Sequence, residues 1–74
     1  MHDHAVLGAA LLDRRRQLGL SQQELADLAG VAVRSVHAAE HGKPTLRLDT
    51  LTDITEALGL ELRLIRRPVG GSVD

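Results

Sequence analysis

A tripeptide, Ala29-Gly30-Val31, separates two short segments with helical patterning, and this break most limits the folds open to the chain. Before it, Ser21-Gln22-Gln23-Glu24 forms a capping box, in which the serine hydroxyl and the glutamate carboxylate each bind an unpaired backbone N–H at a helix start. The first helix is expected to end near Leu28, and the second to run from Val33 to Glu40. Gly30 can adopt a positive φ, so it allows the chain to reverse within a few residues. The pattern predicts two short helices joined by a tight turn.

The flanking segments add two helices and a strand. Helical spacing predicts one helix over residues 5–18 and another over about residues 48–58, the latter with an apolar face of Leu48, Leu51, Ile54 and Leu58. Over residues 60–65 the leucines alternate with charged residues, and a period of two indicates a strand. We therefore expect an all-α domain of four to five helices over residues 5–59, a strand over 60–67 and a flexible tail over 68–74.

Composition narrows the possible functions of the chain. The 74 residues include no cysteine and no aromatic residue, so the core must consist of aliphatic side chains and no platform exists for stacking single-stranded bases. The formal net charge of −1 argues against a non-specific nucleic-acid binder, which is usually strongly basic. The longest apolar run, residues 5–12, is too short to cross a bilayer, and we expect a cytoplasmic protein.

The predicted strand requires a partner. A single strand leaves its backbone N–H and C=O groups unpaired, and the chain offers no second strand candidate. The simplest solution is the same strand of a second copy, paired antiparallel across a two-fold axis. A homodimer would also support a core this small. The residues expected at this interface are Leu60, Glu61, Leu62, Arg63, Leu64, Ile65 and Arg66.

The two short helices and their turn are typical of the helix-turn-helix arrangement, whose second helix enters the DNA major groove. At residue level, the runs Gly19 to Ala26, Ala29-Gly30-Val31 and Glu40-His41-Gly42-Lys43 resemble the Cro/repressor-type (XRE) family of bacterial helix-turn-helix regulators. The resemblance covers residues 7–59. It implies a lambda-repressor-like fold and binding to double-stranded DNA. The expected dimer would set two such helices about one DNA turn apart, which suits a palindromic operator. The short apolar run predicts no membrane partner.

A narrower resemblance covers the second half of the chain. The run from Gly42 to Leu51 and the run from Ala57 to Leu64 resemble the HipB-type antitoxin branch, in which a strand follows the last helix. This resemblance implies a homodimer that represses its own operon and binds a HipA-type serine/threonine kinase toxin. Two alternatives remain: a stand-alone XRE regulator with no toxin partner, and a protein-interaction adaptor of the same fold without specific DNA binding.

The resemblance assigns DNA contacts to particular positions. Gln22 would bind a phosphate at a helix N-terminus, although it could serve in ordinary capping. Arg34 could read guanine through two hydrogen bonds, or remain a solvated arginine. Lys43 and Arg47 would bind phosphates, or act as solubility charges. The remaining outward positions of the second helix expected at the DNA are Ala32, Val33, His37 and Ala38.

Two features of this assignment concern how the second helix is held. In the XRE family the positions of Arg15 and Glu40 pair across the first and third helices of the domain. We therefore expect an ion pair that orients the helix from Val33 to Glu40, which would read the DNA. The alternative is two independent surface charges. Ala32 stands where the family usually has a capping Ser or Thr, and Ala39 stands where it has a larger residue. Each departure should loosen the helix.

Catalytic and metal-binding functions are not expected. His37 and His41 lie four residues apart on one helical face, and His2-Asp3-His4 adds further potential ligands, but neither set is complete, so we expect no metal. Ser35 and the histidines show no arrangement with a carboxylate that would indicate a nucleophile, and no Gly-rich phosphate loop is present. The sequence therefore predicts neither an enzyme nor a cofactor.

Overall fold

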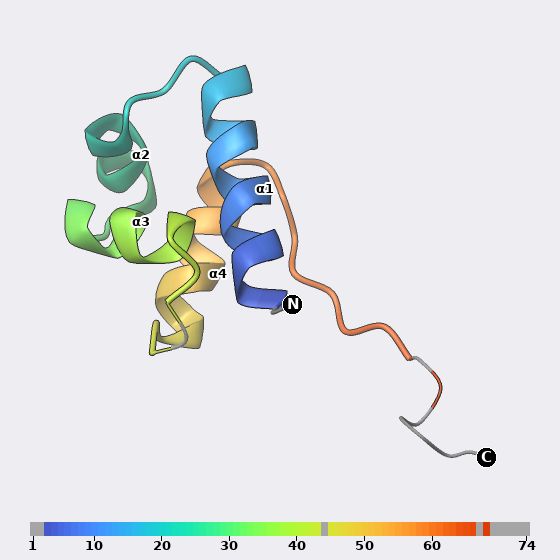
Figure 1. Cartoon of the computed structure of the whole chain (residues 1–74). Helices are drawn as coiled ribbons and strands as arrows, with labels where there is room; N and C mark the ends of the chain where they lie inside the picture. The colour runs from blue at the N-terminus through green and yellow to red at the C-terminus, as the bar shows by residue number, and fades with distance from the viewer. Residues whose placement is uncertain (1–2, 44, 67, 69–74) are drawn as a thin grey trace.

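The computed structural model describes residues 3–43, 45–66 and 68, and within them the chain forms four α-helices. They are α1 (Asp3–Gln17), α2 (Gln22–Ala29), α3 (Val33–Glu40) and α4 (Leu48–Ala57). Helix α3 packs against both α1 and α2, and α4 packs against α2 (Figure 1). After α4 the chain leaves the helices as an extended segment. In the part of the chain described, no helix is long and apolar enough to cross a membrane.

A single aliphatic core joins the four helices. Its members come from every helix and from the residue that follows α4, and each is at most 4% exposed. As the composition requires, the core contains only Leu, Ile, Val and Ala side chains. Helical spacing places these residues on the inward face of each helix, which is how an amphipathic helix buries its apolar stripe. They are Leu11, Leu25, Ala26, Val36, Ala39, Ile54 and Leu58.

Helices α1 and α3 approach one another at a glycine. Gly8 is buried, and a Cβ built on it would lie 2.5 Å from the carbonyl oxygen of Glu40 and 2.8 Å from that of Ala39. Both distances are far below ordinary van der Waals contact, and both neighbours are backbone atoms. The absence of a side chain at Gly8 therefore lets α1 approach the backbone of α3 closely, near the end of α3.

The turn between α2 and α3 forms as its sequence predicts. The Ser21 hydroxyl accepts a hydrogen bond from the Glu24 N–H at 3.0 Å, and the Glu24 carboxylate accepts one from the Ser21 N–H at 2.8 Å. Gly30 ends α2 in the left-handed conformation, with φ of 72°, and its N–H binds the Ala26 carbonyl. The capping box and the glycine turn are confirmed, and they fix where α3 begins.

The start of α3 lacks a side-chain cap. Ala32 occupies the N-cap position with φ of −70° and ψ of 147°, the extended conformation that a capping serine adopts, and makes no side-chain hydrogen bond. A serine oxygen there could accept a hydrogen bond from the first turn of the helix.

We expect Ala32→Ser to stabilise the protein by about 1 kcal/mol, which in a domain of this size raises Tm by about 4–8 °C. Thermal unfolding followed by circular dichroism measures the shift. Ala32→Val is the matched control, since it enlarges the side chain without an oxygen and should give no gain. Equal Tm changes in the two variants would contradict the capping explanation.

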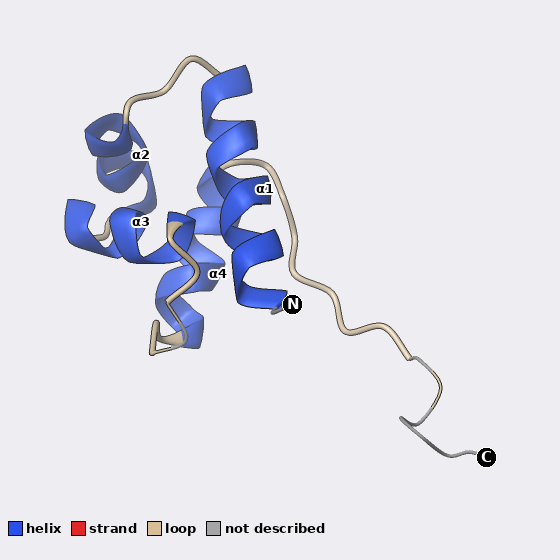
Figure 2. Cartoon of the chain, viewed as in Figure 1, coloured by secondary structure: helices blue, strands red, loops and turns tan. Residues whose placement is uncertain are grey.

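The expected C-terminal strand is not present in the described part of residues 60–67. Residues 60–66 are extended but have no strand structure, and the described part of the chain contains only helices and loops (Figure 2). The physical reason is that the single chain supplies no second strand for pairing. Arg67, the last residue of that prediction, and nearly all of the predicted tail over 68–74 lie outside the described residues; Pro68 alone is described, as loop.

Two predicted boundaries and one predicted face also change. Helix α1 begins at Asp3, two residues before the expected start, and α4 ends at Ala57. Leu48 was expected on the inward face of α4, yet it is 71% exposed, because the buried stripe of that helix begins one turn later. Of the alternating leucines in this segment, Leu60 packs partly against the core, whereas Leu64 is fully exposed.

Candidate nucleic-acid interface

The first feature of the candidate interface is an open, basic hollow between α3 and the loop that leads to α4. The hollow has a volume of about 360 Å³.

 Three cations, one from α3 and two from the loop before α4, meet around the hollow, and none of the residues that line it carries a carboxylate. The residues that line the hollow are Arg34, Ser35, Ala38, Lys43, Thr45, Leu46, Arg47 and Thr50.

The hollow combines positive charge with hydroxyl groups. Arg34, Lys43 and Arg47 supply the charge, and Ser35, Thr45 and Thr50 supply hydroxyls that can donate hydrogen bonds. Anionic oxygens bind most strongly to such charge-assisted donors. The arrangement therefore suits the phosphate groups of a nucleic-acid backbone, and it gathers four of the positions that the sequence predicted for DNA: Arg34, Ala38, Lys43 and Arg47.

One of these cations is already engaged. The Arg47 guanidinium donates to both carboxylate oxygens of Asp49, at 3.1 and 2.9 Å, at the start of α4. Hydrogen bonds from Arg47 and from the Thr50 N–H hold the pKa of Asp49 below its usual range. Both partners are largely exposed, with 79% and 66% of their side chains in contact with solvent. An exposed pair of this kind is weak, so Arg47 can exchange Asp49 for another anion.

The outward face of α3 adjoins the hollow. Arg34 and His37 are exposed and Ala38 is half-buried, so these predicted contacts remain accessible. Ala32 is also exposed, at the start of the helix. Val33 differs, because it packs partly against the core and offers only part of its side chain to a ligand.

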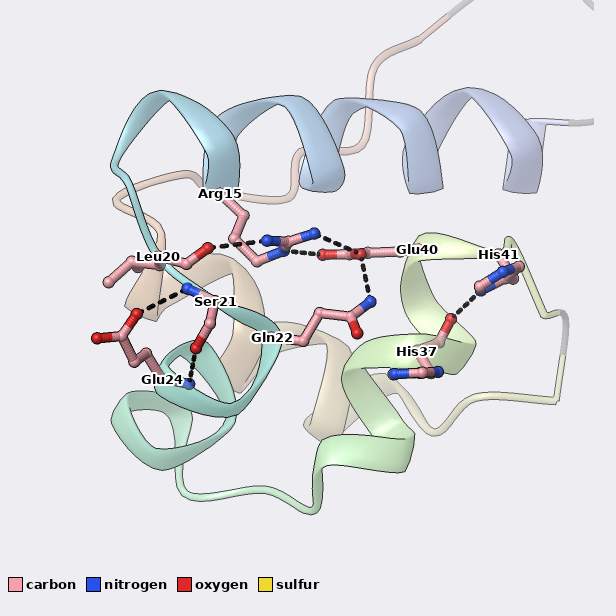
Figure 3. Close-up of polar contacts among 8 residues, drawn as sticks. All are labelled: Arg15, Leu20, Ser21, Gln22, Glu24, His37, Glu40 and His41. Carbon is pink, nitrogen blue, oxygen red and sulfur yellow. Dashed lines mark hydrogen bonds and ion pairs between the residues drawn. The ribbon is translucent and has the colours of Figure 1, made fainter.

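Glu40 ties three helices together at the other end of α3 (Figure 3). Arg15 from α1 donates to both of its carboxylate oxygens, at 2.6 and 3.3 Å, and to the Leu20 carbonyl at 2.8 Å. Gln22 from α2 donates its amide to the same carboxylate at 2.9 Å. The side chains of Arg15 and Glu40 are only 12% and 4% exposed. Arg15 and Glu40, the pair expected from the sequence, are thus in contact in the structure. Gln22 joins them as a third member of the cluster.

The electrostatic state of Glu40 follows from these contacts. Burial by itself raises the pKa of its carboxyl group, but the hydrogen bonds from Arg15 and Gln22 and the charge of Arg15 outweigh that effect. The pKa of Glu40 is therefore lowered from its ordinary value, and the carboxylate stays ionised at neutral pH.

The side chain of Gln22 makes a contact that the sequence did not predict. The sequence suggested a phosphate contact or capping, yet the structure directs the amide nitrogen of Gln22 to Glu40 (Figure 3). The side chain that lies at the first turn of α2 is thereby held by the third helix. Gln22 consequently couples the start of α2 to the end of α3.

His37 of α3 and His41, the residue just after that helix, form a pair of their own. Their rings stack with centroids 6.2 Å apart, and His41 Nδ1 donates to the His37 carbonyl at 2.7 Å (Figure 3). Within the described residues, no cluster of three or more His, Asp or Glu side chains could hold a metal ion. His2 lies outside the described residues, and the side chain of His4 is not described.

Sequence reasoning missed two residues that position the interface. Arg14 donates to the Leu58 carbonyl at 3.0 Å and so fastens α1 to the end of α4. Gly8 sets the contact between α1 and α3. A glycine inside a helical pattern is a recognisable signal of close backbone approach. The contact of Arg14 has no comparable signal in the sequence.

Comparison with known proteins identifies the family. The family model described as Helix-turn-helix matches residues 11–65, which covers α2, the turn, α3 and α4. This chain belongs to the helix-turn-helix family. The chain is also 33% identical over 61 residues to an uncharacterized HTH-type transcriptional regulator, y4mF, of Sinorhizobium fredii (strain NBRC 101917 / NGR234). The alignment covers 82% of this chain and 80% of that protein.

Membership of the helix-turn-helix family assigns the structural roles of two helices. In the helix-turn-helix arrangement the first helix crosses the DNA backbone and the second is the recognition helix. Here those helices are α2 and α3, joined at Gly30. The resemblance to XRE regulators is confirmed at the level of this family.

Proposed function

We propose that this helix-turn-helix protein is a sequence-specific, DNA-binding transcriptional repressor, with α3 as the helix that enters the major groove. The observation that carries the proposal is the basic hollow beside α3, where Arg34, Lys43 and Arg47 converge. A groove-bound helix places its neighbouring loop along the phosphate backbone, and this loop supplies Lys43 and Arg47. The name of the S. fredii relative agrees with a role in transcription.

Within the hollow, each basic residue has a distinct proposed role. Arg34 is exposed on the outer face of α3, so its guanidinium can reach the O6 and N7 atoms of a guanine. Lys43 and Arg47 bind phosphates and position the protein without reading sequence. Arg47 would leave Asp49 to do so, which the exposure of that pair permits. The protein acts by binding alone, with no catalytic step.

DNA titration tests these roles. Labelled duplex from upstream of the gene should bind about a thousandfold more tightly than a scrambled duplex. Arg34→Ala should reduce the preference for the specific duplex by about tenfold or more, because each bidentate contact contributes about 1–3 kcal/mol of discrimination. Lys43→Ala should weaken binding to both duplexes and lower the slope of log affinity against log salt by about one.

The control for these variants is Arg16→Ala, which removes an exposed arginine at the end of α1, outside the hollow. It should leave the specificity unchanged. Equal and weak binding of the wild-type protein to both duplexes would contradict a sequence-specific repressor and favour the adaptor of the same fold.

We further propose that the protein forms a homodimer and is the HipB-type antitoxin of an operon that also encodes a HipA-type kinase. The dimer is supported by Leu64 and Ile65, which are respectively fully and 82% exposed on an extended segment. The antitoxin role is supported only by the sequence resemblance of residues 42–64. Light scattering tests the dimer, and copurification with the kinase encoded beside the gene tests the partner; a free regulator would be recovered without it.

A further inference from the structure

The segment after α4 carries an alternation of charge that the repressor function does not use. Glu61 and Arg63 project to the same side, with Arg63 Nε 3.6 Å from Glu61 Oε1, and both side chains are 75% exposed. Leu62 and Leu64 alternate with these charged residues and, together with Arg63, line a hollow of about 410 Å³ against α4. The alternation therefore gives the segment a leucine face and a charged face, with leucines of the first face lying beside α4.

The backbone of this segment is open for pairing. The Leu60 N–H donates to the Thr55 carbonyl at 2.9 Å, which ties the start of the segment to α4. Among the described residues, no backbone hydrogen bond involves residues 61–66. Unpaired extended backbone with an apolar face is a template for a second strand.

We propose that two copies of this chain pair antiparallel through this segment with the two-fold axis at Leu62, so that Glu61 faces Arg63 of the partner subunit. The proposal rests on the homodimer proposed above and adds its register. With this axis Leu60 faces Leu64 of the partner subunit and Leu62 faces its own copy. One face of the ribbon is then entirely leucine, and the other carries two pairs of opposite charges.

Other registers are electrostatically or hydrophobically worse. An axis at Arg63 or at Glu61 places that charge opposite its own copy, and like charges directly opposite destabilise a sheet. An axis at Leu64 sets Leu62 against Arg66 of the partner subunit. An axis between two residues shifts the pairing by one residue. Leucines of one strand then lie opposite charged residues of the other, on the same face of the ribbon.

The occupied N–H of Leu60 also fixes which residues form hydrogen bonds. In an antiparallel pair, every second residue of a strand directs its N–H and C=O to the partner strand. The backbone groups of Leu60, Leu62 and Leu64 therefore all point to the same side. Because Leu60 already donates to Thr55, the bonding residues are Glu61 and Arg63. Leu62 then forms a non-hydrogen-bonded pair with its own copy, in which side chains approach most closely. The leucine face can cover the hollow beside Leu48 and Leu51.

Charge reversal tests the register. Glu61→Arg alone places arginine opposite arginine at both pairs, and Arg63→Glu alone places glutamate opposite glutamate. We expect each variant to dimerise about tenfold more weakly than the wild type, whereas an equal mixture of the two should form a heterodimer of nearly wild-type affinity. The double variant, with both charges exchanged, should dimerise by itself. Native mass spectrometry separates these species.

The control is Arg16→Glu, which reverses an exposed charge at the end of α1, outside the paired segment, and should leave dimerisation unchanged. Helix content by circular dichroism confirms that every variant folds. A wild-type dimer whose two single variants fail to form a heterodimer would overturn the register and leave the homodimer intact. A monomeric wild type would overturn the homodimer and the register together, while DNA binding is measured separately.

The absence of natural cysteine permits a second measurement. Leu62→Cys should oxidise to a covalent dimer, because the two copies of this residue lie directly opposite each other at the short spacing that a disulfide requires. Leu64→Cys should remain largely uncrosslinked. Preferential crosslinking at residue 64 would place the axis there and overturn the proposed register.

Discussion

Gly8→Ala will destabilise the protein by about 2–3 kcal/mol, although the same change in a helix interior normally stabilises. The added Cβ would lie 2.5 Å from the Glu40 carbonyl oxygen and 2.8 Å from the Ala39 carbonyl oxygen. Neither backbone atom can rotate away as a flexible side chain would. Helix α1 must therefore separate from α3, which loosens the core and shifts the recognition helix. Urea unfolding measures the free-energy change, and DNA titration measures its effect on binding.

The matched control lies in the same helix. Ala9 and Ala10 are exposed, so Ala10→Gly should lower the stability by about 1 kcal/mol through helix propensity alone. Opposite substitutions in one helix would then both destabilise. A stability increase for Gly8→Ala would mean that propensity outweighs the steric contact, and that α1 and α3 separate easily.

Glu40→Ala will lower the free energy of unfolding by about 3 kcal/mol at neutral pH, because it leaves the largely buried Arg15 guanidinium without its counter-charge. A domain this small has only a few kcal/mol of stability, so the milder Glu40→Gln, which keeps the size of the side chain, provides a variant that stays folded. We expect DNA affinity to fall in both, since Glu40 holds α1 and α2 against α3. Chemical unfolding and DNA titration measure the two effects.

The contribution of Glu40 should depend on pH. A carboxyl group whose pKa is lowered on folding stabilises the native state above its unfolded pKa, and this stabilisation is lost as pH falls through the folded value. The pKa of Glu40 is lowered, so the stability difference between wild type and Glu40→Gln should narrow as the solution is acidified below about pH 4. A difference that stays constant with pH would show that the charge of Glu40 contributes nothing.

The exposed pair of Arg47 and Asp49 is the control for the buried one. It has the same two-bond geometry, but both side chains are mostly in contact with water. We expect Asp49→Ala to change stability far less than Glu40→Ala does, because solvent screens an exposed pair. A loss as large as that of Glu40→Ala would mean that burial does not distinguish the two pairs.

Local sequence signals predicted the helices well. The capping box at Ser21 and the glycine at Gly30 act through neighbouring residues, so their geometry can be derived from the sequence around them. The start of α3 at Val33 and its end at Glu40 follow from the same local rules. The contact of Arg15 with Glu40 was expected because a family resemblance supplied the long-range information.

Contacts between distant segments were harder to predict. The approach of Gly8 to α3, the bond from Arg14 to Leu58 and the commitment of Gln22 to Glu40 depend on how the helices pack. Periodicity also misplaced Leu48, since it defines a face of the helix but not where along the helix burial begins. The strand required a second chain, which periodicity alone cannot supply. The assigned DNA contacts stay predictions.

The recognition helix is secured unequally along its length. Its last turn is held by the ion pair at Glu40 and by the contact with Gly8, whereas its first turn begins at Ala32 without a side-chain cap. The helix is thus fixed at its C-terminal end and less constrained at its N-terminal end, where Arg34 lies. A recognition helix held in this way should adjust its N-terminal end to small variations in groove geometry. It should therefore accept a wider set of related operators than a helix fixed at both ends.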